Sequence, residues 1–154
     1  MEPVVGAPDP GLDGLRRLRT ELGGSMAALE QALAPPTSGQ HAAWAERVDV
    51  ALVELTADFD EHVVMTEGSG GLHDAVIQAE PRLSNAVRRL VSEHTVIRDL
   101  VADLLDRVRP PVAPNDVDGI RERGTALLGR LARHRRHGAD LVHQAYEVDL
   151  GGET

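Results

Sequence analysis

The chain has 154 residues, enough for one domain with a sizeable core, and its formal net charge of −9 at pH 7 argues against binding to nucleic acid or to an anionic membrane. Aromatic residues make up only 2% of the sequence, so the core must be aliphatic, which favours packing of helix on helix. The chain has no cysteine, no segment like a signal peptide and no apolar run of membrane length, so thiolate chemistry is excluded and a cytoplasmic protein is expected.

The first predicted helix follows a short tail. Residues 1–10 are rich in proline and are expected to be flexible, and the folded domain is expected to cover 11–152. The helix begins at Gly11 and ends before Pro35 and Pro36. Apolar residues recur along it at three- and four-residue steps, which is typical of an amphipathic helix: Leu12, Leu15, Leu18, Leu22, Met26, Leu29 and Leu33.

The second predicted helix starts after Ser38, whose hydroxyl can cap unpaired backbone donors. One stripe of this helix carries Trp44, Val48, Leu52, Leu55, Phe59 and His62. The glycine-rich stretch 68–71 is expected to break or kink the helix, and 72–79 continues as a short helical segment.

The third and fourth predicted helices complete the domain. Pro81 suits the first turn of the third, the loop 109–114 ends it, and Asn115 caps the fourth, which ends at 151–152. The apolar seam of the third helix is Leu83, Val87, Leu90, His94, Ile97, Val101, Leu105 and Val108. The inner face of the fourth is Val117, Ile120, Leu127, Leu131, His134, Leu141 and Ala145. This pattern predicts an all-α, antiparallel up-down four-helix bundle with a Gly-rich break in the second helix.

Three of the seven histidines, His62, His94 and His134, lie on the apolar stripes of their helices. His62 and His94 are each sixteen residues from Gln78, beside the turn between their helices, so an antiparallel pair places them level. His94 precedes Val112 by eighteen residues and His134 follows it by twenty-two, a mismatch of roughly 6 Å. We therefore expect three imidazoles to meet in one layer.

A layer of buried imidazoles predicts a metal or cofactor site. Each buried ring needs a polar partner and tends to stay neutral, and neutral imidazole is the form that binds metals. His137, one turn beyond His134, is a further candidate ligand. His73 is expected either to belong to a lid or to have no role, and Glu93, which points about 100° away from His94, is expected to make a surface contact.

Short motifs surround these histidines. The segment 59–67 reads FDEHVVMTE, 90–94 reads LVSEH, and 131–134 reads LARH. In this order they resemble the hemerythrin-like, or HHE, cation-binding family, which has His followed by Glu in its second helix, Glu-His in its third and a further His motif in its fourth. The resemblance covers nearly all of 11–152. It implies a four-helix bundle around a non-haem diiron or related centre for sensing or redox chemistry of gases, peroxide or iron.

The sequence departs from this family pattern at three places. No histidine precedes His41, Thr66 stands where the family has a carboxylate four residues after His62, and Gly138 stands at the same offset after His134. In a diiron bundle the carboxylates bridge the two cations and offset their charge. We therefore expect mononuclear rather than dinuclear non-haem iron.

Glu67 is the carboxylate that can complete such a site. It lies five residues past His62, off the stripe, and the glycine-rich break directly after it can turn it inward. With His62, His94 and His134 it makes a three-histidine, one-carboxylate set suited to iron, manganese or zinc. The alternative is that Glu67 is exposed at a fraying helix end. Haem with a histidine axial ligand is another alternative, because Gly138 removes bulk beside the layer.

Three functions follow from these alternatives. The first is a metal- or haem-binding module that senses or performs redox chemistry on a small molecule such as O2, NO or peroxide. The second is a metal-free bundle with an interaction or regulatory role, and the third is a hydrolase that uses metal-bound water. The sequence identifies no catalytic residue, so whether the chain is an enzyme stays open, as does its oligomeric state.

Overall fold

The computed structural model describes residues 10–35, 37 and 39–151, with the side chains of 10–13, 15 and 147–151 left out. The long helices are α1 (Pro10–Leu33), α2 (His41–Glu67), α4 (Ser84–Val108) and α5 (Val117–Gly151). Between them lie the short helix α3 (Leu72–Ala79) and two 3-10 turns, η1 (Pro81–Leu83) and η2 (Pro114–Asp116). The described residues contain no strand, which confirms the predicted all-helical class. Of the tail predicted over 1–10, Pro10 is already helical, and the rest lies outside the described residues.

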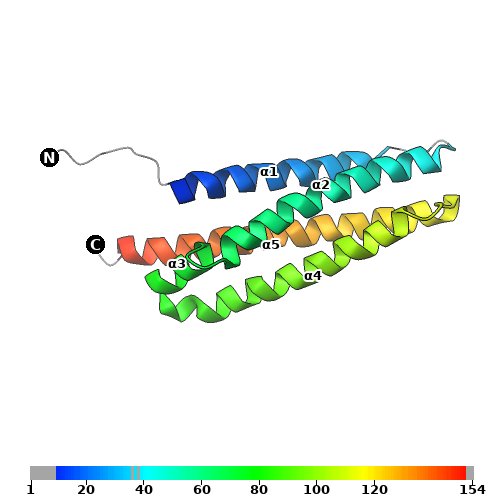
Figure 1. The fold of residues 1–154 in the computed structure, drawn as a ribbon. Coiled ribbons are helices and arrows are strands. Elements are labelled where there is room, and N and C mark those ends of the chain that lie inside the picture. The colour runs from blue at the N-terminus through cyan, green and yellow to red at the C-terminus, as the bar shows by residue number, and fades with distance from the viewer. Residues whose placement is uncertain (1–9, 36, 38, 152–154) are drawn as a thin grey trace.

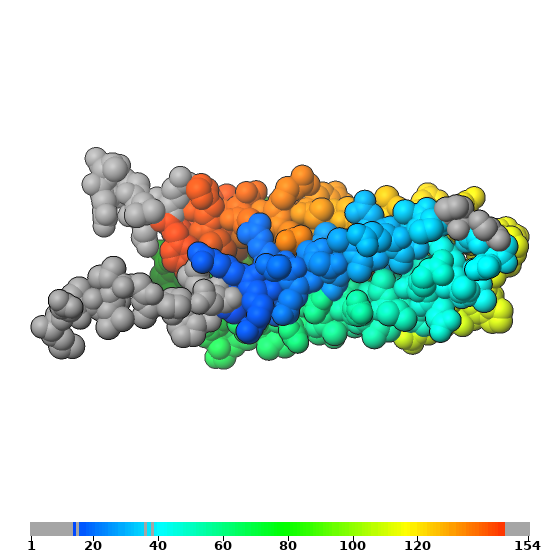
Figure 2. All heavy atoms as spheres, turned by 90° about the horizontal axis from the view of Figure 1, so that it is seen from above, coloured from blue at the N-terminus to red at the C-terminus, as the bar shows by residue number. Residues whose placement is uncertain are grey.

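The long helices lie side by side in an elongated bundle (Figure 1). The chain runs along α1, turns back along α2, and reaches α3 at the end of the bundle where α1 began. α4 then runs away from that end, and α5 returns to it. Seen from above in Figure 2, α1 (blue) lies across one face between α5 (orange) and α2 (cyan to green), and it contacts both. α4 contacts both α2 and α5, so it adjoins the two other helices that carry candidate histidines.

Each long helix buries one stripe, and the buried residues form two apolar clusters. The larger cluster runs along α1, α2, α4 and α5 and includes Leu22, Trp44, Leu52, Phe59, Ile97, Leu127 and Leu131. The smaller one lies beside α3 and consists of Val76, Leu83, Val87, Leu90, Leu141 and Ala145. Most of the predicted inner-face residues whose side chains the structure describes are buried, whereas Met26, His62 and Leu105 are only partly buried. On α4, Leu104 is buried in place of Leu105. The side chains of Leu12 and Leu15 lie outside the described part. In the described part of the chain, no helix combines the length and the apolar character needed to cross a membrane.

Two residues that were predicted to cap helices, Ser38 and Asn115, do not occupy the N-cap positions of α2 and α5. Gln40 occupies the N-cap of α2, without a side-chain hydrogen bond, so the helix does not start from Ser38, which itself lies outside the described residues. Asn115 does not cap α5 either, because it lies within the 3-10 turn η2. In that turn the carboxylate of Asp116 accepts the backbone N–H of Ala113 at 3.0 Å. A 3-10 turn pairs its backbone groups through short-range hydrogen bonds. Because Asn115 lies inside such a turn, it does not stand at the N-cap of α5.

The chain turns sharply between α2 and α3. Gly70 has φ of +73°, a backbone conformation that L side chains rarely adopt. A Cβ on Gly71 would lie 2.5 Å from the carbonyl oxygen of Met65, so there is no room for a side chain there. The carboxylate of Asp74 accepts the N–H of Gly70 at 2.8 Å. This turn sends α3 across the end of the bundle, beside α2, α4 and α5.

Candidate metal centre

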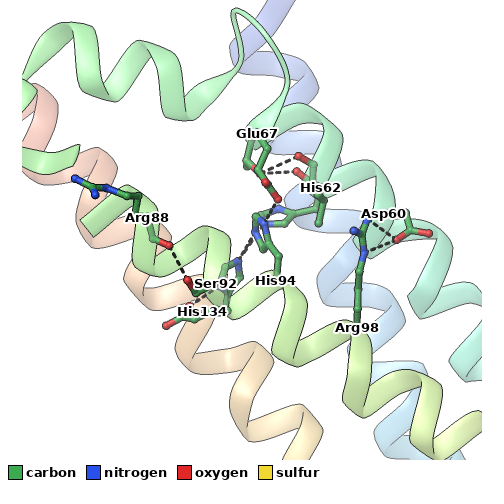
Figure 3. A network of polar contacts seen from close by, with 11 residues as sticks. Asp60, His62, Glu67, Arg88, Ser92, His94, Arg98 and His134 are labelled. Atoms are coloured by element: carbon green, nitrogen blue, oxygen red, sulfur yellow. Dashed lines mark hydrogen bonds and ion pairs between the residues drawn. The ribbon is translucent and has the colours of Figure 1, made fainter. Parts of the chain in front are cut away.

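Three imidazoles from three helices meet inside the bundle. His62 lies on α2, His94 on α4 and His134 on α5, and their rings point toward one another (Figure 3). Nε2 of His134 lies 3.0 Å from Nε2 of His94 and 3.2 Å from Nε2 of His62. One ring nitrogen from each lies within 4.8 Å of the other two. The rings thus come together as the helical register predicted.

The layer lies between the two apolar clusters. His94 has the smaller cluster on one side, through Leu90, and the larger on the other, through Ile97. His94 is 2% exposed and His134 is 3% exposed. Phe59 closes the layer on one side, with its ring centroid 5.6 Å from that of His94 and 5.8 Å from that of His62. The imidazoles of His94 and His134 are therefore held away from water, whereas His62 is partly exposed.

The outer ring nitrogens of two of these histidines face carboxylates. Oε2 of Glu67 lies 2.5 Å from Nδ1 of His94, as Figure 3 shows. Oε2 of Glu93 lies 2.5 Å from Nδ1 of His134, and its Oε1 lies 2.9 Å from Nδ1 of His137. Metal-binding histidines in proteins usually donate their outer N–H to such a carboxylate, which sets the ring orientation and the tautomer.

Burial keeps the central imidazoles neutral. The loss of hydration, and after it the neighbouring imidazoles, lower the pKa of His62 and of His94 to about 3. Burial also lowers the pKa of His134, although Glu93 acts in the opposite direction. For Glu93, burial alone would raise the pKa, but hydrogen bonds from His134 and His137 outweigh it and the pKa is lowered. At neutral pH the pair of Glu93 and His134 is therefore a carboxylate beside a neutral ring.

These tautomers leave the inner nitrogens without a proton. An ionised carboxylate only accepts hydrogen bonds, so Nδ1 of His94 and Nδ1 of His134 carry the protons. The two Nε2 atoms, 3.0 Å apart, then face each other with lone pairs and no hydrogen between them. Such a contact is repulsive unless a positive charge lies among the nitrogens, and the low pKa of His94 disfavours a proton in that place. A metal cation satisfies the arrangement.

The spacing of the nitrogens suits one cation. Ligands at about 2.05 Å from a tetrahedral zinc ion are roughly 3.3 Å apart, close to the 3.0 and 3.2 Å of the two pairs that include His134. The nitrogens of His62 and His94 lie within 4.8 Å of each other. Imidazole nitrogen is a good ligand for zinc, iron, copper and nickel. Three histidines leave a fourth position of a tetrahedral ion open, which is the arrangement of catalytic rather than structural metal sites.

The other predicted site residues surround this group without joining it. Glu67 is exposed at the end of α2, as the alternative expected, and its carboxylate contacts the outer nitrogen of His94 instead of completing the nitrogen cluster. His137, whose side chain is 55% exposed, contacts Glu93 and not the cluster. Thr66 is buried and donates its hydroxyl to the carbonyl oxygen of His62 at 2.9 Å, so it offers no ligand in place of a carboxylate. Beside Gly138 an added Cβ would meet no atom within 4 Å.

Glu93 makes a surface contact, as expected, with the exposed His137, but its other oxygen also contacts the buried His134, which was not predicted from the sequence. The sequence held a signal for this contact: His134 and His137 are three residues apart, so both lie along one flank of their helix, where a carboxylate from the neighbouring helix can reach them.

His73 was also missed as part of the layer. It is buried, and its ring stacks on that of His94, with centroids 6.0 Å apart and planes 9° apart. Its spacing of three residues from Val76, on the buried face of α3, was the available signal. His41, half-buried at the start of α2, and His143, exposed on α5, do not belong to the layer.

Comparison of the chain with protein-family models, with curated proteins and with solved structures finds no match in any of the three. The resemblance to the hemerythrin-like family therefore stays a prediction based on short motifs, and any functional assignment depends on the geometry of the histidine layer.

Proposed function

We propose that this chain binds a single metal cation through Nε2 of His62, His94 and His134. The observation that carries the proposal is the contact of 3.0 Å between two buried Nε2 atoms whose rings present their protons to carboxylates on the other side. Two lone pairs at that distance need a shared positive charge. A hydrogen-bonded core pair would instead have one ring donate to the other.

Two carboxylates assist the ligands in this proposal. Glu67 orients His94, and Glu93 orients His134. Their negative charges also offset the charge of a divalent cation through the rings that they contact. Since both carboxylates are used on outer nitrogens, neither bridges two cations, and this favours a mononuclear site over a dinuclear one. Nitrogen ligation is compatible with iron or zinc and suits manganese less well.

The frame that we propose for the site is an antiparallel up-down bundle interrupted after Glu67 by the glycine-rich break. The path of the chain in Figure 1 and the helix ends at Glu67 and Leu72 support it. The break frees the end of α2, so that Glu67 can reach His94 although it lies off the apolar stripe of its helix.

The cellular use that we propose is sensing of, or redox chemistry with, a small molecule such as O2, NO or peroxide, as expected of a hemerythrin-like protein. Three nitrogen ligands with an open fourth position support this use, because a bound cation can then take up one further small ligand. When bound, iron would supply the redox chemistry, while the protein supplies the three nitrogens and the exclusion of water by Phe59 and the apolar clusters. A cytoplasmic location stays a prediction from the sequence.

Haem is less well supported by this geometry. A haem iron needs an imidazole nitrogen that faces a flat open space, but each inner Nε2 faces another imidazole at 3.0 to 3.2 Å. A porphyrin between these rings would require the three helices to separate.

The test is elemental analysis and an absorption spectrum of the freshly purified protein after expression in iron-rich medium. We expect close to one metal ion per chain, no Soret band, and loss of the metal in His94→Ala. His41→Ala serves as the matched control, since this histidine lies about 31 Å from His62 along the same helix. A metal-free protein that also fails to bind added iron or zinc would contradict the proposal and favour the interaction bundle.

A further inference from the structure

The turn between α2 and α3 brings a fourth imidazole, that of His73, against the histidine layer. His73 is 6% exposed, and its ring lies parallel to that of His94 at a centroid distance of 6.0 Å. The positive φ of Gly70 and the lack of space at Gly71 show that the turn has a defined shape, which fixes where α3 begins. His73 is thus held in place by backbone geometry and by packing of α3 on three other helices.

Nδ1 of His73 is buried and has no hydrogen-bond partner. Buried polar atoms in folded proteins nearly always have a partner, because an unpaired one loses the hydrogen bond that water would give it. The other layer histidines on α4 and α5 have their Nδ1 atoms paired with carboxylates. The unpaired nitrogen beside them therefore indicates that a small molecule belongs next to His73.

His73 stacks on one of the three proposed ligands without joining the group of three nitrogens. The nitrogens of His62, His94 and His134 lie within 4.8 Å of one another, and His73 does not belong to that group. Its ring instead stacks on the ring of His94, which is one of the proposed ligands. A neutral imidazole offers an N–H donor there, which is suited to an anion bound to the metal.

We propose that His73 binds, through Nδ1–H, a small anion held at the open fourth position of the cation. The inference rests on the proposed metal site and adds to it the residue that selects its further ligand. The burial of His94 and His134 restricts that ligand to a few atoms. A charge-assisted hydrogen bond of this kind is stronger than one between neutral groups.

Azide binding to the cobalt-loaded protein tests this proposal. Cobalt(II) gives a visible spectrum that changes when an anion enters its coordination sphere, so one titration series measures cobalt affinity and a second measures azide affinity. The variant His73→Phe keeps an aromatic ring against His94 and removes both nitrogens. We expect its azide affinity to fall at least tenfold, with cobalt affinity within about threefold of the unmodified chain. His73→Asn, which keeps an amide donor near Nδ1, should recover part of the azide affinity.

Several outcomes would overturn the proposal. Equal azide affinity in His73→Phe and in the control His41→Gln would show that His73 does not contact the anion. A large loss of cobalt affinity in His73→Phe would make His73 a metal ligand instead. If His73→Phe does not fold, His73→Leu provides the same comparison. If the unmodified chain does not bind cobalt, the proposed metal site itself is contradicted. If the chain binds cobalt but its azide affinity is the same with and without His73, only the role of His73 is contradicted.

Discussion

Glu93 Oε2 lies 2.5 Å from Nδ1 of His134, on the side of the ring opposite to the nitrogen that faces His94. The same carboxylate contacts Nδ1 of His137 with its other oxygen. A charge on α4 thus sets the tautomer of a ring on α5, and with it the direction of the lone pair that the proposed cation would accept.

Replacement of Glu93 should therefore weaken metal binding without abolishing it. In Glu93→Gln the negative charge is lost and the ring of His134 is less firmly oriented, so we expect metal affinity to fall roughly 10- to 100-fold. The measurement is a zinc or cobalt titration of the purified variant. Glu122→Gln, which changes an exposed carboxylate on α5, should leave the affinity unchanged. The same affinity in both variants would show that Glu93 has no orienting role.

Bound metal should stabilise the fold. A cation that binds only the folded chain adds about 2.7 kcal/mol to the free energy of unfolding at a concentration 100 times its Kd. For a domain of this size we expect the Tm to rise by roughly 5–10 °C. Thermal unfolding followed by circular dichroism, with and without zinc, checks this, and a chelator should reverse the shift. His134→Ala should show no rise, and an equal rise in that variant would indicate binding elsewhere.

The metal-free protein should lose stability as the pH falls from 7. In the folded chain, His62 and His94 have pKa values of about 3, well below the ordinary value of 6.5, because of burial first and the neighbouring imidazoles second. Between pH 6.5 and pH 3 the unfolded chain binds more protons than the folded one, so each such histidine lowers the free energy of unfolding by up to about 1.4 kcal/mol per pH unit. Urea unfolding in the presence of a chelator at pH 7, 6 and 5 measures the slope. A free energy of unfolding that does not change over this range would contradict the burial of neutral rings.

Phe59 should matter for metal affinity as well as for stability. Its ring packs against those of His62, His94 and His134, with centroid distances of 5.8, 5.6 and 6.3 Å. Phe59→Leu should lower the free energy of unfolding by about 1 kcal/mol and weaken metal binding, because the imidazoles lose a supporting surface. Val48 is fully buried and lies nearer the start of α2 than Phe59, away from the histidine layer. Val48→Ala should therefore reduce stability but leave metal affinity unchanged. Equal effects of both variants on affinity would indicate a general loss of structure.

Gly71 and Gly138 should respond oppositely to alanine. Gly138 lies within α5, where a Cβ meets no atom within 4 Å, so Gly138→Ala should raise the free energy of unfolding by about 0.5–1 kcal/mol. At Gly71 a Cβ would lie 2.5 Å from the carbonyl oxygen of Met65, so Gly71→Ala should destabilise the turn. Denaturant unfolding of both variants decides the signs. A destabilised Gly138→Ala would mean that the space beside this glycine is needed.

The sequence predicted the buried seams of the helices better than the contacts made from their flanks. The seams of α2, α4 and α5 were predicted nearly residue by residue, because periodicity of apolar residues reports directly which face of a helix is buried. The error at Leu105 arose where two leucines are adjacent in sequence and periodicity alone does not choose between them; Leu104 is the one that packs inside. The contact of Glu93 with His134 and the burial of His73 in the layer were not predicted, because Glu93 lies on the flank of its helix and His73 lies beyond a sharp turn.

The sequence by itself determined the all-helical class, the buried stripes and the common height of His62, His94 and His134, since helical rise and rotation per residue are constant. Only the tertiary structure decided which atoms meet: Nε2 on the inside, and carboxylates on the outside from Glu67 and Glu93. Those contacts depend on how neighbouring helices are rotated and on where the turn after Gly68 directs the chain. These quantities are set by side-chain packing between segments far apart in sequence, which local periodicity does not report.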